Sequence, residues 1–375
     1  MNCSAFAAFF LLLVPGIAVR AAGPETVLTL APGDENPRNS EGDFIELKDG
    51  RIQFIYTRFS GGKGSDHDKA ELVSRVSGDH GKTWSKTDEM VLPNEGGWNV
   101  MSVSLLRLAD GRIALFYLRK NSLEDCRPLV RFSSDETKSW SEPVVMIPDS
   151  EVGYFVLNND RVIQLKSGRL IAPVALHNRP GWEQPDWQGE ITAYLSDDSG
   201  HSWRQAKTSQ KIIGANGKRI TAQEPGVVEL KDGRVMKWVR TNAGDQFRSI
   251  STDGGESWSG FEPMGLPSPV SPATIERFPD SGHLLAIWND HSKLPAAGRK
   301  LRTPFSAAIS RDDGKTWKPL GKPIDGNPKG WFCYTAMLFV EDDVLLGHCA
   351  GVQEPMKHLA TTKITRVPLE WLESN

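Results

Sequence analysis

The chain has 375 residues and a formal net charge of −3 at pH 7, which gives no basic field to attract nucleic acid or anionic membranes. Its 35 glycines, 24 prolines and 12 tryptophans accompany short apolar runs bounded by turn residues, a pattern that favours an all-β fold over a helical one. An anionic partner would therefore need a local basic site.

The first 21 residues are predicted to be a cleaved export signal. An apolar stretch runs from Phe6 to Val19, and Val19 and Ala21 suit the −3 and −1 positions of a cleavage site. A retained anchor is the alternative, although the segment is short for a spanning helix. We expect residues 22–375 to form one domain that is secreted or periplasmic and free of the membrane after cleavage.

Signal cleavage would leave three cysteines, Cys126, Cys333 and Cys349. They are widely spaced and match no metal-ligand pattern. One disulfide can form among them, but buried thiols are the simpler interpretation. We expect no metal ion and no cofactor.

A short turn motif recurs six times, each time between two apolar runs. The first copy is Leu47-Lys-Asp-Gly50-Arg-Ile, which predicts a tight hairpin between two strands. Copies at intervals of 48 to 65 residues suit four-stranded blades with generous loops. The copies start at Leu47, Leu108, Leu165, Leu230, Phe278 and Val340.

A second motif, S-x-D-x-G-x-[TS]-W, recurs five times at a different phase. Its aspartate caps backbone N–H groups of its own loop, its glycine adopts a positive φ, and its tryptophan packs the turn onto the blade. The motif is therefore structural. The two repeats predict a six-bladed β-propeller in which 26–30 and 359–367 pair to close the ring. The copies span 77–84, 133–140 (with Thr137 in place of glycine), 196–203, 251–258 and 310–317.

The register of the hairpins points to one site. Six positions before each turn motif, at the start of each innermost strand, one residue per blade should form a ring around a mouth of the central channel. Glu224 and Tyr334 should therefore face the same opening although 110 residues separate them. The ring comprises Glu41, Ser102, Asn159, Glu224, Pro272 and Tyr334.

These motifs resemble the sialidase (neuraminidase) superfamily, whose hallmark is this Asp-box turn on a six-bladed propeller, and the likeness covers nearly the whole mature chain. The resemblance implies a tyrosine nucleophile paired with a glutamate, which match Tyr334 and Glu224. It also implies three arginines that clamp the substrate carboxylate. They match Arg38, Arg240 and Arg302, although Arg38 lies in Pro37-Arg38-Asn39-Ser40-Glu41 instead of the family's usual arginine-isoleucine-proline.

The chemistry of a sialoside explains this set of residue types. Its anomeric carbon carries a carboxylate, which would repel an anionic nucleophile, whereas a neutral phenol avoids that repulsion. Tyrosine nucleophiles are a known exception to the scheme of two carboxylates in glycosidases. The phenol needs a base, which Glu224 can supply, and guanidinium groups bind a carboxylate through paired hydrogen bonds.

The family's acid/base is an aspartate on a loop of the first blade. Here that loop is glycine-rich and contains Asp66 and Asp68; we choose Asp66 and keep Asp68 as the alternative. The acting residue must hold its proton at the working pH, which predicts a mildly acidic optimum. Asn159 and Asp160 are candidates for binding the acyl or glycerol arm of the sugar, and the loop 177–188 for stacking on sugar rings.

The sequence therefore predicts an exo-alpha-sialidase that removes terminal sialic acid from glycoconjugates with retention of configuration. Two alternatives stay open. The substrate could be a related acidic sugar, or the protein could be a carbohydrate-binding propeller without catalysis, because Asp boxes also occur in propellers that are not enzymes.

Overall fold

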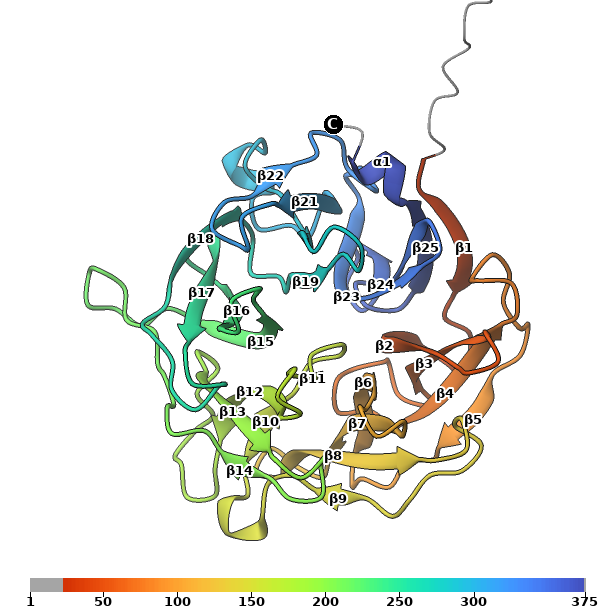
Figure 1. The fold of residues 1–375 in the computed structure, drawn as a ribbon, viewed down its shortest axis with the longest axis horizontal. Coiled ribbons are helices and arrows are strands. Elements are labelled where there is room, and N and C mark those ends of the chain that lie inside the picture. Colours follow the sequence, from red (N-terminus) through yellow and green to blue (C-terminus); the bar gives the residue numbers. More distant parts are fainter. Residues whose placement is uncertain (1–22, 374–375) are drawn as a thin grey trace, which may run out of the picture.

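The computed structural model describes residues 23–373, which form six β-sheet blades around a central axis (Figure 1). The predicted signal segment lies outside the described residues. Within 23–373, four blades are separate four-stranded sheets, and one nine-stranded sheet comprises the second and third blades. These two blades are joined by a single parallel bridge between Tyr154 and Cys126. The predicted six-bladed architecture is confirmed.

Each blade begins with its innermost strand and proceeds outward by antiparallel pairing, so that the innermost strands surround the axis (Figure 1). The first two blades are β2 (Arg38–Glu46), β3 (Ile52–Phe59), β4 (Ala70–Ser77) and β5 (Glu89–Leu92), followed by β6 (Asn99–Arg107), β7 (Ile113–Lys120), β8 (Cys126–Ser133) and β9 (Val144–Val145). The third comprises β10 (Tyr154–Val156), β11 (Ile163–Gln164), β12 (Leu170–Asn178), β13 (Glu190–Ser196) and β14 (Arg204–Gln205).

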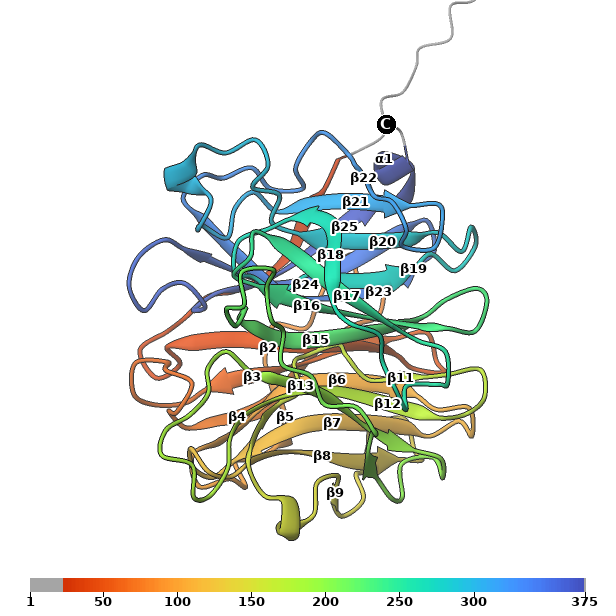
Figure 2. The same ribbon diagram turned by 90° about the vertical axis from the view of Figure 1, so that its left-hand side faces the viewer.

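The second half of the ring repeats this order, and seen from the side its strands run from one face of the disc to the other (Figure 2). The fourth and fifth blades are β15 (Ala222–Glu229), β16 (Val235–Thr241), β17 (Asp245–Ser251) and β18 (Glu262–Pro267), followed by β19 (Thr274–Arg277), β20 (Leu284–Trp288), β21 (Ser306–Ser310) and β22 (Lys318–Pro319). The sixth contains β23 (Gly330–Val340), β24 (Asp343–Val352) and β25 (Thr362–Pro368).

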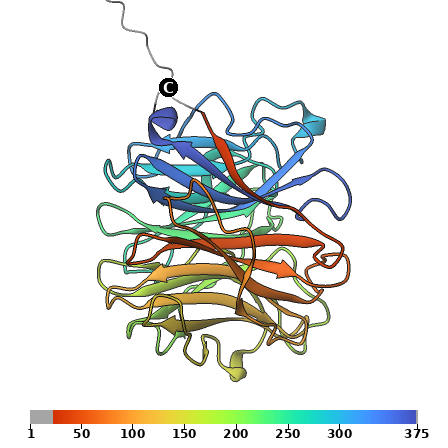
Figure 3. The same cartoon turned by 90° about the vertical axis from the view of Figure 1, so that its right-hand side faces the viewer.

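The ring is closed by strands from the two ends of the described chain. β1 (Glu25–Leu30) pairs antiparallel with β25 and becomes the outermost strand of the sixth blade; Figure 3 shows this red strand beside the blue ones. The predicted closure is confirmed. A short helix, α1 (Leu369–Glu373), follows β25, and the 3₁₀ turns are η1 (Asp149–Glu151) and η2 (Ala296–Gly298).

The predicted Asp-box turns connect the third and fourth strands of their blades. In the fourth blade, Asp253 Oδ1 accepts hydrogen bonds from Ser251 Oγ (2.8 Å) and the Ser257 amide (2.9 Å). Trp258 Nε1 donates to the Gly255 carbonyl at 3.0 Å. In the second blade Thr137 takes the glycine position with φ +67°, a strained conformation for a β-branched residue. The turns thus fasten the blades and take no part in the site.

Polar side chains tie the blades together across the axis. Arg161 is 2% exposed and donates to the Ala273 carbonyl (2.9 Å) and to Thr274 Oγ1 (3.2 Å). Thr274 Oγ1 in turn donates to the Thr335 carbonyl at 2.6 Å. The third, fifth and sixth blades are therefore linked through buried hydrogen bonds, whose loss is costly.

The cysteines match the simpler interpretation. Among residues 23–373, Cys126, Cys333 and Cys349 are all free and buried. In the same part of the chain, no helix has the length and apolarity needed to cross a bilayer.

Replacing an Asp-box carboxylate should loosen one blade. Hydrogen bonds from Ser257 and Ser251 lower the pKa of Asp253 to about 2 even though desolvation opposes the shift, so this carboxylate stabilises the fold at pH values above about 4 and loses that effect as the pH falls towards 2. We expect Asp253→Ala to lower the free energy of unfolding at pH 7 by about 1–2 kcal/mol, measured by urea unfolding. Asp280→Ala is the control, because that exposed turn aspartate makes no side-chain hydrogen bond within residues 23–373. An equal loss in both variants would contradict the assignment.

Candidate active site

Four innermost strands share a backbone irregularity at the ring predicted from the sequence. Their residues at that position have positive φ: Glu41 (+53°), Ser102 (+60°), Glu224 (+50°) and Tyr334 (+55°). Each lies where the pairing with the next strand shifts register. Such bulges re-aim a side chain, and left-handed backbone at non-glycine residues is costly, so both features are concentrated at functional sites. All four side chains line one cavity with a volume of about 210 Å³.

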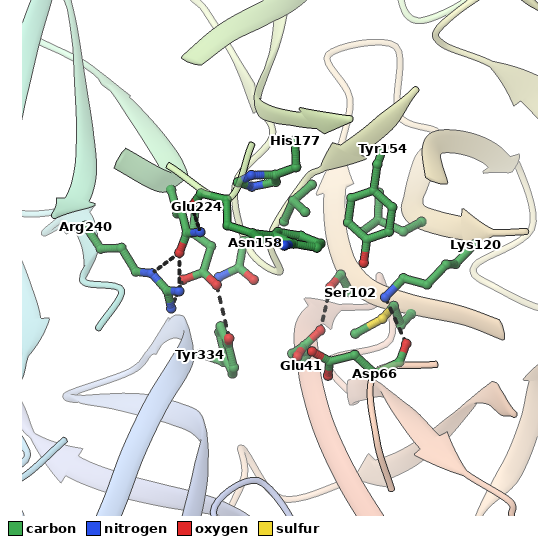
Figure 4. Close-up of a pocket in the computed structure, with 15 residues that line it drawn as sticks. Glu41, Asp66, Ser102, Lys120, Tyr154, Asn158, His177, Glu224, Arg240 and Tyr334 are labelled. Atoms are coloured by element: carbon green, nitrogen blue, oxygen red, sulfur yellow. Dashed lines mark hydrogen bonds and ion pairs between the residues drawn. The ribbon is translucent and has the colours of Figure 1, made fainter. Parts of the chain in front are cut away.

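Tyr334 and Glu224 meet in this cavity (Figure 4). The Tyr334 hydroxyl donates to Glu224 Oε1 at 3.0 Å. Glu224 Oε2 forms an ion pair with Arg240 Nη1 at 2.9 Å, and Arg240 Nε donates to Gln223 Oε1 at 3.0 Å. Burial and the charge of Glu224 raise the pKa of Tyr334 well above its ordinary value, so the phenol is neutral in the empty cavity and can ionise only by giving its proton to a base.

Arg302 lies near the Tyr334 ring and is not among the residues that line the cavity. Its guanidinium carbon is 5.6 Å from the centroid of Tyr334 and 5.2 Å from that of Trp331. Arg302 and Arg240 both act on Tyr334 electrostatically and favour its ionised form. Two of the three predicted arginines therefore flank the phenol.

Arg38, the third predicted arginine, lies behind two lining residues, Glu41 and Asp66, and does not itself line the cavity. Its side chain is 3% exposed and forms ion pairs with Glu41 Oε1 (2.8 Å) and Asp66 Oδ1 (2.5 Å). Ser102 Oγ donates to the other oxygen of Glu41 at 2.5 Å. The cavity wall next to Arg38 thus consists of carboxylates that already neutralise it.

The structure separates the two aspartates proposed as acid/base. Asp66 lines the cavity with a side chain 57% exposed, whereas Asp68 Oδ2 accepts the amides of Lys63 (2.9 Å) and Ser65 (2.8 Å) and so holds the loop in shape. Partial burial raises the pKa of Asp66, but the positive charges of Arg38 and Lys120 outweigh it and lower the pKa to about 2. In the empty cavity Asp66 is therefore ionised.

The loop that carries Asp66 is fastened to the second blade. Asn99 Nδ2 donates to the carbonyls of Asp66 (3.0 Å) and Asp68 (2.7 Å). Lys120 Nζ donates to the Asp66 carbonyl at 2.9 Å. The backbone of the loop is thus tied to β6 and β7, in addition to the support from Asp68 within the loop and from Arg38 on the Asp66 side chain.

The prediction that Asn159 and Asp160 contact a ligand does not agree with their positions. Asn159 Nδ2 donates to the carbonyls of Gly42 (2.9 Å) and Tyr334 (3.0 Å), and its side chain is fully buried. Asp160 Oδ2 accepts the amide of Met337 at 3.1 Å. Both tie the third blade to the first and sixth blades across the axis, and the residue of this segment that lines the cavity is Asn158.

The sequence analysis missed several residues of the cavity wall. Lys120 and Tyr154 contact each other, with the ammonium 5.3 Å from the ring centroid, and His177 also lines the cavity (Figure 4). Trp187 is a further lining residue, and its ring centroid is 5.5 Å from that of His177. Trp187 is 49% exposed; of the loop 177–188, it and His177 reach the cavity. Glu41 and Ser102 were on the predicted ring but received no role. Lys120 is the last residue of β7 and lines the cavity. Counting forward from the hairpin turn to the end of the second strand could have identified it in the sequence.

Removing the tie between Asn99 and the loop should free the segment that carries Asp66. We expect Asn99→Ala to increase amide hydrogen exchange across residues 60–69 by about tenfold, because the Asp68 carbonyl loses its donor and the Asp66 carbonyl keeps only Lys120. Asn216→Ala, which changes a turn contact to the Lys218 amide, is the control and should leave exchange in 60–69 unchanged. Unaltered exchange in Asn99→Ala would show that Lys120 and Asp68 suffice to hold the loop.

Similarity to known proteins agrees with this fold. A curated relative, the anhydrosialidase of Macrobdella decora, is 26% identical over 218 residues, which are 56% of this chain and 25% of that protein; the chain thus matches about a quarter of its relative's length. A protein of unknown function from Dyadobacter fermentans superposes with a TM-score of 0.69 at 21% identity, over 92% of this chain and 99% of that one.

Solved sialidases also have this fold. The Trypanosoma rangeli sialidase in complex with the inhibitor DANA superposes with a TM-score of 0.68 at 16% identity, over 90% of this chain and 56% of that one. The NanB sialidase from Streptococcus pneumoniae superposes with a TM-score of 0.72 at 14% identity, over 93% of this chain and 71% of that one. Residues 59–346, more than half of the chain, match the family model of the BNR repeat-like domain. The protein therefore belongs to the BNR repeat-like domain family and has the six-bladed propeller fold of sialidases.

Proposed function

We propose that the protein is a retaining exo-sialidase that removes terminal sialic acid from a glycan or glycoconjugate. The observation that carries the proposal is the contact of Tyr334 with Glu224 in one cavity, with Arg240 in the cavity wall and the Arg302 guanidinium near the Tyr334 ring. A phenol paired with a carboxylate suits attack on an anomeric carbon that already carries a negative charge. The arginines supply the local anion site that a mildly acidic chain otherwise lacks.

In the first step, Tyr334 Oη attacks the anomeric carbon while its proton passes to Glu224. The bond to the aglycone breaks, and the leaving oxygen takes a proton from Asp66. A tyrosyl-linked sugar results. In the second step, Asp66 takes a proton from water and the water oxygen bonds to the anomeric carbon. The bond from that carbon to Tyr334 Oη breaks, and Tyr334 recovers its proton from Glu224. Two displacements retain the configuration.

The charged residues have separate tasks in this scheme. Arg240 and Arg302 lower the cost of an ionised phenol and attract the substrate carboxylate. Gln223 accepts from Arg240 and orients its planar group. The predicted export signal would place such an enzyme outside the cytoplasm, where glycoconjugates are available.

Replacing the nucleophile tests the proposal. We expect Tyr334→Phe to lower kcat for an aryl sialoside by at least about 10³-fold while the affinity for DANA changes little, because the variant lacks the attacking oxygen and keeps the cavity. Tyr117→Phe is the matched control, since that hydroxyl donates to Glu95 in the second blade, away from the cavity. Undiminished turnover in Tyr334→Phe would refute the mechanism. DANA binding without any turnover by the wild type would favour a carbohydrate-binding propeller, and turnover of another acidic aryl glycoside alone would change the sugar.

The acid/base assignment is tested through the leaving group. We expect Asp66→Asn to slow an alkyl sialoside by about 10²–10⁴-fold and an activated aryl sialoside much less, because a good leaving group needs no proton. Asp68→Asn should slow both substrates by a similar, smaller factor, since its effect is on loop shape. The reverse pattern would assign the acid to Asp68.

A further inference from the structure

Arg38 has two carboxylate partners in the empty cavity. One is Asp66, which we assign as the acid; the other is Glu41, which has no part in the proposed chemistry. Glu41 is 4% exposed, lies at the ring position of β2 with φ +53° and lines the cavity. A buried carboxylate next to the arginine that should receive the substrate's carboxylate is a direct competitor for it.

The charges around this pair can be counted. The facing groups are Arg38 and Glu41 from β2, Asp66 and His67 from the loop, Lys120 from β7, and the neutral side chains of Tyr154, Cys126 and Cys349 from β10, β8 and β24. Two cations, Arg38 and Lys120, balance two carboxylates. A ligand carboxylate that binds Arg38 would make three negative charges against two positive ones on this side of the cavity, where an unpaired charge is expensive; Arg240 and Arg302, with the single carboxylate of Glu224, lie on the side of Tyr334.

Protonation of either Glu41 or Asp66 restores the charge balance at the lowest cost in free energy. Two carboxylic groups that share a site commonly hold one proton between them. A proton on Asp66 would also convert it from the ionised form of the empty cavity into the form that can protonate a leaving oxygen.

We propose that Glu41 is a positioning residue of this site. With Asp66 it holds Arg38 in the empty cavity, and an entering carboxylate takes over Arg38 while the Glu41 and Asp66 pair gains one proton. The inference rests on the proposed function and adds a role for Glu41 to it. Substrate binding would thus leave Asp66 protonated and able to act as the acid.

The electrostatics of the empty cavity support this exchange. Burial raises the pKa of Glu41, although Arg38 opposes the shift. The pKa of Asp66 is kept at about 2 chiefly by Arg38 and Lys120. Transfer of Arg38 to a ligand removes this effect and adds a negative charge nearby, and both changes raise the pKa of the pair.

The test is calorimetric titration of the wild-type protein with DANA at pH 7, in buffers of low and high ionisation enthalpy. The difference in heat counts the protons taken up, which we expect to approach one. The affinity for DANA should then rise by up to about tenfold for each pH unit as the pH falls from 7.5 to 5.5. A heat that is the same in all buffers would overturn the proposal.

Glu41→Gln distinguishes competition from a merely structural role. With one carboxylate fewer, the ligand restores balance without a proton, so we expect uptake below half that of the wild type, a flatter pH dependence, and binding at pH 7 as tight as in the wild type or tighter. A structural role predicts weaker binding at every pH with an unchanged slope. Asp66→Asn removes the other carboxylate and should flatten the slope in the same way, which keeps the test decisive if Glu41→Gln does not fold.

Two control variants locate the proton. Glu46→Gln removes an exposed carboxylate on the same strand whose side chain contacts neither Arg38 nor the cavity, and it should behave as the wild type. His67→Asn should also keep the pH dependence of the affinity for DANA. Loss of proton uptake on DANA binding in this variant would place the proton on His67 and overturn the proposal.

Turnover of an aryl sialoside by the wild type, measured in parallel, separates the two levels of inference. Turnover with DANA binding but without proton uptake overturns the exchange alone. Absence of both turnover and DANA binding overturns the exchange together with the proposed function.

Discussion

The site depends on the hydrogen bond between Tyr334 and Glu224, which joins the innermost strands of the fourth and sixth blades across the axis. The two residues reach each other because both lie at bulges with positive φ, which turn their side chains towards the axial opening. Glu224 is held at its other oxygen by Arg240, and the Trp238 ring lies where a side chain at Gly226 would be, 2.2 Å from an added Cβ. The contact is therefore fixed on the Glu224 side by residues of the fourth blade.

Charge is distributed unevenly around this contact. On the side of Tyr334, Arg240 and Arg302 make a positive region whose guanidiniums share a single carboxylate of the cavity, Glu224. On the opposite side, Arg38 is matched by Glu41 and Asp66. An anionic ligand meets net positive charge on the first side and a neutralised arginine on the second, so full use of all three arginines requires a rearrangement of protons.

Much of this arrangement follows from counting along the repeats. The spacing of the hairpin turns placed Glu41, Ser102, Glu224 and Tyr334 on one ring, and all four line the cavity. In the third blade the count fails by a small step, since the inner strand is interrupted between β10 and β11 and the positive φ falls on Asp160 instead of Asn159. Asn158 reaches the cavity for that reason. In the fifth blade Pro272 lies at the counted position, just before β19, and its side chain is absent from the cavity wall.

The sequence by itself determined the blade count, the Asp-box turns and the ring positions of Tyr334 and Glu224, because these depend on local turn chemistry and on a repeat that preserves register along the chain; the roles of these two residues came from the resemblance to sialidases. Only the tertiary structure decided which charges face one another. The pairing of Arg38 with Asp66, the support of the Asp66 loop by Asn99 and Lys120, and the burial of Asn159 between Gly42 and Tyr334 join residues from different blades. Their distances depend on side-chain directions at the axis, which no spacing along the chain specifies.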